Sequence, residues 1–120
     1  MHQLETVIGH TFKDPSLLET ALTHTSYANE AKGHVKHNER LEFLGDSVLS
    51  IVVADYLFHH WKDRPEGELT KARASLVCES ALFQFAQEID LGRYLRLGRG
   101  EEMGGGRNRP SVVSDAFEAV

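Results

Sequence analysis

Apolar residues recur every three or four positions along most of the chain, which is the spacing expected of one face of a helix. The longest such segment runs over residues 38–61, with Asn38 at the N-cap position, and it is broken by Pro65 and Gly67. A shorter segment starts at Asp14, a second candidate N-cap, followed by a proline where a first turn tolerates one. Further stretches with helical spacing cover residues 68–78, 79–90 and 111–120.

Signs of β-structure are lacking in the sequence. No stretch alternates between apolar and polar residues with hairpin turns at its ends, and no internal repeat is found. Residues 28–37 are polar and residues 98–109 contain five of the ten glycines, so both stretches are expected to be loops. A chain of 120 residues is enough for one domain. The pattern therefore predicts a single all-α domain over residues 1–120.

The long segment over residues 38–61 presents two different faces when it is placed on a helical wheel. Glu39, Glu42 and Asp46 fall within about 60° of one another and form an acidic face. Phe43 lies beside the acidic face and away from the apolar one. The apolar face is broad and is expected to pack into the core; it consists of Leu41, Leu44, Val48, Ile51 and Val52.

A second pair of acids, Asp115 and Glu118, stands near the end of the chain at i, i+3 spacing. Carboxylates on one helix face repel each other by roughly 1 kcal/mol in water and about 4 kcal/mol at an effective dielectric of 20. A solvated surface face is the common reason for such a pattern. Two acidic pairs that meet within a small bundle would instead form an all-oxygen cage, which suits Mg²⁺ or Mn²⁺. No glutamate has a histidine three residues later, which argues against a di-iron carboxylate site.

The charge balance disfavours a simple nucleic-acid-binding domain, because 13 basic and 18 acidic residues leave a net charge of −5. The charge is uneven, however. Residues 1–61 hold 4 basic and 8 acidic residues, whereas residues 62–109 hold 9 and 8. Such a chain can approach a polyanion only if cations neutralise its acidic part.

Composition and cysteine content indicate the compartment. With 41% hydrophobic and 26% charged residues, the chain has the composition of a soluble globular protein. No apolar run approaches the ~18 residues of a membrane span, and the first residues do not resemble an export signal. The single cysteine, Cys78, cannot form an internal disulfide. We therefore expect a cytoplasmic protein without a membrane segment.

One stretch is specific enough to resemble a known family. Residues 37–49 read His-Asn-Glu-Arg-Leu-Glu-Phe-Leu-Gly-Asp-Ser-Val-Leu, and residues 114–120 read Ser-Asp-Ala-Phe-Glu-Ala-Val. Together they resemble the catalytic domain of bacterial ribonuclease III, with weaker likeness at residues 21–26 and 65–68. The resemblance covers essentially the whole chain. It implies an all-α, homodimeric endonuclease that cuts double-stranded RNA with a divalent metal, Mg²⁺ or alternatively Mn²⁺.

The resemblance also implies roles for particular side chains. Glu39 and Glu66 match two further acids that line the family's cleft, and Phe43 matches an aromatic residue that inserts into the partner subunit. The resemblance implies four metal ligands, which are Glu42, Asp46, Asp115 and Glu118. Among these four, Asp46 and Glu118 match the least replaceable, catalytic pair.

The implied reaction is hydrolysis of phosphodiesters, in which a bound metal activates water and stabilises the leaving 3′ oxygen. The products would carry 5′ phosphates, 3′ hydroxyls and two-nucleotide 3′ overhangs, in the processing of ribosomal and messenger RNA. The alternative is a non-catalytic relative that binds structured RNA, although such a protein is expected to have lost some of the four acids. The family's catalytic domain extends beyond the position of Val120 and is usually followed by a double-stranded-RNA-binding domain. We therefore expect a truncated nuclease domain without that second domain.

Overall fold

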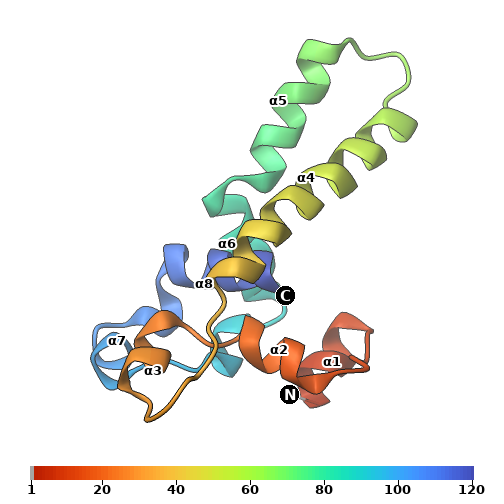
Figure 1. The fold of residues 1–120 in the computed structure, drawn as a ribbon. Coiled ribbons are helices and arrows are strands. Elements are labelled where there is room, and N and C mark those ends of the chain that lie inside the picture. Colours follow the sequence, from red (N-terminus) through yellow and green to blue (C-terminus); the bar gives the residue numbers. More distant parts are fainter. Residues whose placement is uncertain (1) are drawn as a thin grey trace.

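The computed structural model describes residues 2–120, which form eight α-helices and two short 3₁₀ helices (Figure 1). No strand occurs in this part of the chain, although one isolated β-bridge joins Thr23 to Arg96. The prediction of an all-α domain is confirmed. The helices are α1 (His2–Ile8), α2 (Pro15–Ala21), α3 (Thr25–Glu30), α4 (Glu39–His60), α5 (Glu66–Val77), α6 (Glu79–Glu88), η1 (Leu91–Tyr94), α7 (Arg99–Met103), η2 (Gly106–Asn108) and α8 (Pro110–Ala119).

The molecule consists of a body and a projecting helical hairpin (Figure 1). Helices α4 and α5 form the hairpin and run side by side away from the body, so that the molecule measures 54 × 32 × 24 Å. Helix α8 lies at the base of the hairpin, where it packs against both α4 and α6. The hairpin therefore joins the body mainly through the first half of α4 and through α8.

One apolar core holds the body together, and it draws side chains from both ends of the chain. Helix α2 begins as predicted, because Asp14 accepts a hydrogen bond from the backbone N–H of Ser16 (3.0 Å) and Pro15 occupies the first turn. Helix α8 contributes one whole face to the core. The buried residues of the core are Leu4, Leu18, Leu22, Ala86, Leu91, Leu95, Val112, Val113 and Ala116.

The predicted burial of the apolar face of the long helix is wrong for four of its five residues, whereas Leu41 is partly buried. Leu44 is 59% exposed, Val48 49%, Ile51 71% and Val52 57%, and we call these four residues the α4 apolar face. Leu57 is the buried residue of this helix. The reason is that α4 leaves the body after its first turns, and its outer part packs mainly against α5, which leaves these four side chains largely uncovered. None of the helices described combines the length and the apolar character that a membrane crossing requires.

The glycine-rich stretch that was expected to be a loop instead contains α7 and η2. The guanidinium of Arg107 holds it in place by donating to the carbonyl oxygens of Gly92 (2.9 Å), Arg93 (3.2 Å) and Leu95 (2.9 Å). The same group pairs with the carboxylate of Glu102 at 2.6 Å. The three carbonyl groups lie 12–15 residues before Arg107, outside the glycine-rich stretch, so local glycine content did not reveal the order of this segment.

Asn38 lies at the predicted start of α4, but its side chain does not cap the helix. Its Nδ2 donates to the carbonyl oxygen of Ala21 (3.1 Å), and its backbone N–H donates to that of Thr23 (2.9 Å). The residue is only 5% exposed. The residue between Ala21 and Thr23 is also tied down, because the carbonyl oxygen of Leu22 accepts a hydrogen bond from the backbone N–H of Arg96 (2.8 Å). A buried amide therefore fixes the start of α4 to the segment that follows α2.

Replacing Asn38 should destabilise the fold without touching any acidic residue. In Asn38→Ala the carbonyl of Ala21 loses its side-chain partner inside the protein, which should cost about 1–3 kcal/mol of unfolding free energy. Asn29→Ala, at an exposed position of α3, is the matched control and should change stability little. Urea unfolding measures both. Equal unfolding midpoints for the two variants would contradict this account of how α4 is anchored.

Candidate metal centre

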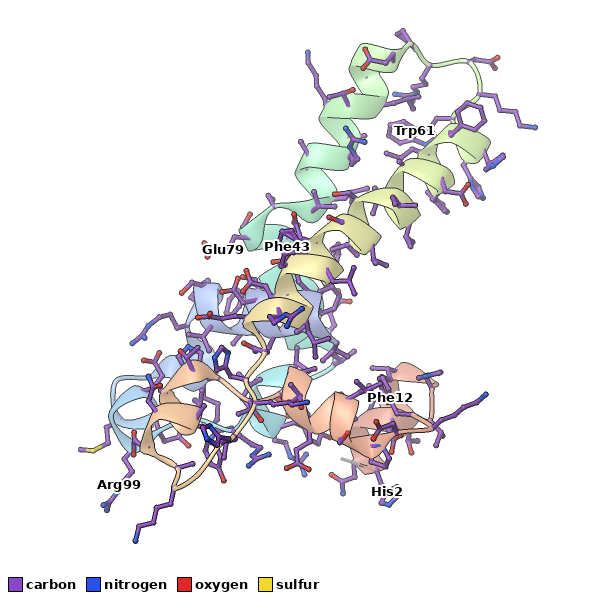
Figure 2. All side chains as sticks on the ribbon, in the orientation of Figure 1. His2, Phe12, Phe43, Trp61, Glu79 and Arg99 are labelled. Atoms are coloured by element: carbon purple, nitrogen blue, oxygen red, sulfur yellow. The ribbon has the colours of Figure 1, made fainter. Side chains whose placement is uncertain are left out.

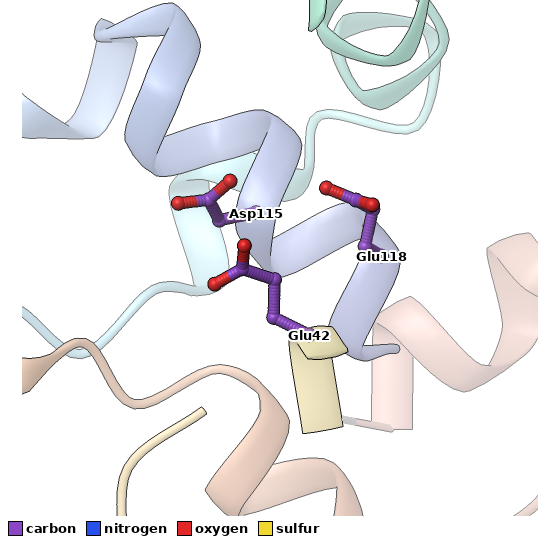
Figure 3. A group of neighbouring side chains, drawn as sticks. All are labelled: Glu42, Asp115 and Glu118. Carbon is purple, nitrogen blue, oxygen red and sulfur yellow. The ribbon is translucent and has the colours of Figure 1, made fainter. Parts of the chain in front are cut away.

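Acidic residues from two distant parts of the chain meet where α4 contacts α8 (Figure 3). Glu42 comes from the first turn of α4, and Asp115 and Glu118 come from α8. Each side chain is half-buried, and one carboxylate oxygen from each lies within 4.8 Å of those of the other two. We call these three residues the acidic cluster.

The position of the cluster follows from how α8 packs. Val112, Val113 and Ala116 are buried and turn one face of the helix toward the core. Asp115 and Glu118 are three residues apart and therefore share a neighbouring face. That face meets α4, so the burial of an apolar stripe also brings two carboxylates to the third.

The electrostatics of the cluster are those of a site with too little positive charge. The pKa of Glu118 is raised to about 8. Partial burial is the largest cause, and the proximity of Asp46, Glu42 and Asp115 is the next. Partial burial and the charge of Asp115 raise the pKa of Glu42. Burial also raises the pKa of Asp115, although a hydrogen bond with Glu42 opposes the change. None of the ion pairs within residues 2–120 involves these carboxylates.

The other predicted acids lie at different distances from the cluster. Asp46 is exposed one turn further along α4 and lies close enough to Glu118 to raise its pKa, so it adjoins the cluster. Glu39 is exposed at the start of α4, where its charge contributes to the raised pKa of Glu42. Glu66 is the first residue of α5, at the outer end of the hairpin, and its carboxylate accepts a hydrogen bond from Thr70 (2.9 Å). The structure does not bring Glu66 to the cluster.

Phe43 lies on α4 next to Glu42 and projects from the helix into solvent (Figure 2). Its side chain is 76% exposed, although a phenyl ring is usually buried in a folded protein. The exposed ring is close in sequence to the α4 apolar face. Both features leave a large apolar surface uncovered on the same helix that carries half of the predicted ligands.

Sequence reasoning missed His24 as a neighbour of the cluster. Its Nδ1 accepts a hydrogen bond from the backbone N–H of Ser26 (3.1 Å), which fixes the ring at the start of α3. From there the His24 imidazole lowers the pKa of Asp115, in opposition to the larger effect of burial. No local pattern in the sequence connects residue 24 with α8, because the electrostatic influence depends on how the chain folds.

Comparison with known proteins agrees with the all-α fold and shows the family. The family model described as ribonuclease-III-like matches residues 14–120. Ribonuclease 3 of Clostridium perfringens is 54% identical over 118 residues, which are 98% of this chain and 49% of that protein. The chain therefore spans about half the length of the curated relatives it matches.

Solved structures give the same result. The nuclease domain of ribonuclease III from Campylobacter jejuni shares 45% identity at a TM-score of 0.89, covering 98% of this chain and 78% of that one. Dicer from Pichia stipitis shares 33% identity at a TM-score of 0.65, covering 91% of this chain and 44% of that one. The fold is that of a ribonuclease III nuclease domain. The chain belongs to the ribonuclease-III-like family, which confirms the resemblance seen in residues 37–49.

The raised pKa of Glu118 predicts that the metal-free protein loses stability as the pH rises. When folded, Glu118 keeps its proton to about pH 8, whereas the ordinary value is 4.5. Between these values the folded state binds more protons than the unfolded state, so stability falls with increasing pH. Melting temperatures measured in a chelator from about pH 5 to about pH 8 should show this decline.

The variant Glu118→Gln should flatten the decline, because its amide does not titrate. Glu88→Gln, at an exposed position of α6, is the control and should keep the pH dependence of the unsubstituted protein. If Glu118→Gln retains the full decline, the titration arises elsewhere and the electrostatic description of the cluster is wrong.

Proposed function

We propose that this protein is a divalent-metal-dependent endoribonuclease that hydrolyses phosphodiesters of double-stranded RNA. The observation that carries the proposal is the acidic cluster, three carboxylates within 4.8 Å on two helices, in a member of the ribonuclease-III-like family. In this proposal Glu42, Asp115 and Glu118 hold the metal together with Asp46, and Asp46 and Glu118 are the catalytic pair. Glu39 completes the acidic face toward the substrate.

The residues present fit a hard divalent cation. All of the donor atoms are carboxylate oxygens, which Mg²⁺ and Mn²⁺ prefer over the softer metals that histidine and cysteine bind. The raised pKa values of Glu42 and Glu118 show that the site binds protons more tightly than isolated carboxylates do. A dication would offset the same excess of negative charge. We propose Mg²⁺ as the cofactor, with Mn²⁺ as the alternative.

The chemistry divides between the cation and the chain. A bound divalent cation would supply Lewis acidity, which activates water and stabilises charge on the leaving oxygen. Asp46 and Glu118 must both be ionised to act as ligands, so a bound cation has to displace the proton that the raised pKa of Glu118 retains. Glu42 and Asp115 are brought side by side by the packing of α4 against α8, and they would hold the cation from the two helices. No side-chain nucleophile is needed for this reaction.

The expected products carry 5′ phosphates and 3′ hydroxyls, with two-nucleotide 3′ overhangs. Their expected role is the processing of ribosomal and messenger RNA precursors in the cytoplasm. The net charge of −5 fits this scheme only with cations present, because the protein and RNA otherwise repel each other.

We also propose that two copies of the protein form a homodimer through α4. Phe43 is 76% exposed and the α4 apolar face is uncovered, so a large apolar surface stands next to the acidic cluster. A two-fold contact would let each copy cover the same surface of the other. The nuclease domain from Campylobacter jejuni has a region involved in dimer formation, which supports this arrangement.

Cleavage is tested by incubating the protein with long double-stranded RNA, with and without Mg²⁺. Glu118→Gln should reduce cleavage at least ~100-fold, because losing a direct ligand should exceed the 10–100-fold effect of losing a group that only supports one. RNA binding should survive, since the lost charge repels phosphate. Glu88→Gln is the control and should cleave normally. Normal turnover by Glu118→Gln would refute the assignment, and binding without cleavage by the unsubstituted protein would favour the non-catalytic alternative.

Dimer formation is tested with Phe43→Ala. Because burying a phenyl side chain contributes roughly 1.5–3 kcal/mol, the dimer dissociation constant should rise by about tenfold or more. Met103→Ala is the control, because Met103 is 88% exposed on α7 and lies outside α4. Sedimentation equilibrium measures both variants. An unsubstituted protein that remains monomeric at tens of micromolar would contradict the proposed dimer.

A further inference from the structure

Gly45 lies on α4 between Glu42 and Asp46, at the point where α8 comes closest. The backbone of Glu118 passes directly against it. A Cβ atom at position 45 would lie 2.6 Å from the carbonyl carbon of Glu118 and closer still to its carbonyl oxygen, whereas ordinary contacts of a Cβ lie at 3.4–4 Å. The two helices therefore approach to a distance that only glycine permits at this position.

This contact cannot be relieved by a small local movement. The atoms that a Cβ would meet belong to the backbone of α8, which cannot rotate away as the end of a side chain can. Helix α8 is itself held by its buried residues Val112, Val113 and Ala116. A larger residue at position 45 must consequently push α4 and α8 apart or slide one along the other.

Local helix stability does not account for a glycine here. Glycine in a helix interior is less favourable than alanine, because it loses more conformational freedom on folding. Gly100 in α7 gives a useful comparison, since a Cβ at that position would meet nothing within 4 Å. Gly45 thus weakens its own helix, and the close approach of α8 is what its small size permits.

We propose that Gly45 is a positioning residue for the metal centre: its missing side chain sets the separation at which carboxylates from α4 and α8 converge. The contacting atoms belong to Glu118 itself, so any displacement of that backbone carries a predicted ligand with it. Mg²⁺ requires near-ideal geometry with oxygen ligands at about 2.0–2.1 Å, and functional geometries tolerate errors of only about 0.5 Å. A shift of the size needed to admit a Cβ exceeds that tolerance. This inference rests on the proposed function, because it assumes that the acidic cluster binds a divalent cation.

The test compares Gly45→Ala, Gly100→Ala and the unsubstituted chain in calorimetric titrations with Mn²⁺ alone. The Mn²⁺ dissociation constant of Gly45→Ala should rise at least tenfold, while that of Gly100→Ala should not change. Circular dichroism reports the fraction of folded protein in each sample. Measuring both the Mn²⁺ affinity and the folded fraction separates a positioning role of Gly45 from a purely structural one. A purely structural role would lower the melting temperature and leave the Mn²⁺ affinity of the folded molecules unchanged.

A folded Gly45→Ala variant that binds Mn²⁺ as tightly as the unsubstituted chain would overturn the inference and leave the proposed function intact. An unsubstituted chain that does not bind Mn²⁺ would overturn the proposed function and the inference with it. If Gly45→Ala is unfolded in buffer, all three titrations are repeated in trimethylamine N-oxide, which favours compact states. Under those conditions the same difference in affinity is expected, and equal affinities would again overturn the inference.

Discussion

Mutual repulsion among carboxylates is the constraint on which the rest of this structure depends. Glu42, Asp115 and Glu118 are held within 4.8 Å of one another although no lysine or arginine is paired with them in the described chain. Charges at such distances repel by about 4 kcal/mol per pair at an effective dielectric of 20. Partial burial, together with the neighbouring carboxylates, raises the pKa of Glu118 to about 8, so without a metal the fold reduces this cost by keeping a proton. The apolar core must supply the remainder.

The two helices at the site are each fixed by a different interaction. The buried face of α8 ties it to α6 and to the N-terminal helices through the core. Helix α4 is fixed at its start by the buried amide of Asn38, and beside the cluster by its contact with α8 at Gly45. The hairpin beyond this point contributes little burial of its own, so the rigidity needed for a metal site comes from the body rather than from α4 and α5.

Local periodicity predicted α2, α4, α5, α6 and α8 and the pairing of acids within α4 and α8, but it did not predict the short helices α1, α3 and α7. Glu42 and Asp46 on one helix, and Asp115 and Glu118 on another, follow from spacings of three or four residues. Spacing and the small size of the domain raised the meeting of the two pairs only as one of two possibilities, and the resemblance of residues 37–49 and 114–120 to a known family made it the favoured one. Long-range packing also explains the errors. The amide of Asn38 bonds to Ala21 rather than capping its own helix, because the chain brings a carbonyl group to it from a distant segment.

The α4 apolar face also shows that local periodicity cannot predict long-range packing. Periodicity identified an apolar face on this helix, but it cannot specify whether that face packs into the core or against another surface. Within residues 2–120 it does not come from the core, since Ile51 remains 71% exposed. Glu66 likewise could be matched to a motif but not placed, because its distance from the cluster depends on the length and direction of the hairpin.

The central claim is that the carboxylates of α4 and α8 form one site for a divalent cation. A crystal structure of the protein grown with Mn²⁺ and measured at the manganese absorption edge tests this directly, because anomalous scattering locates the ion without reference to any assumed ligand. The account predicts an anomalous peak at coordination distance from Glu42, Asp115 and Glu118. Manganese bound only at other groups, such as His59 and His60 at the end of α4, would contradict it.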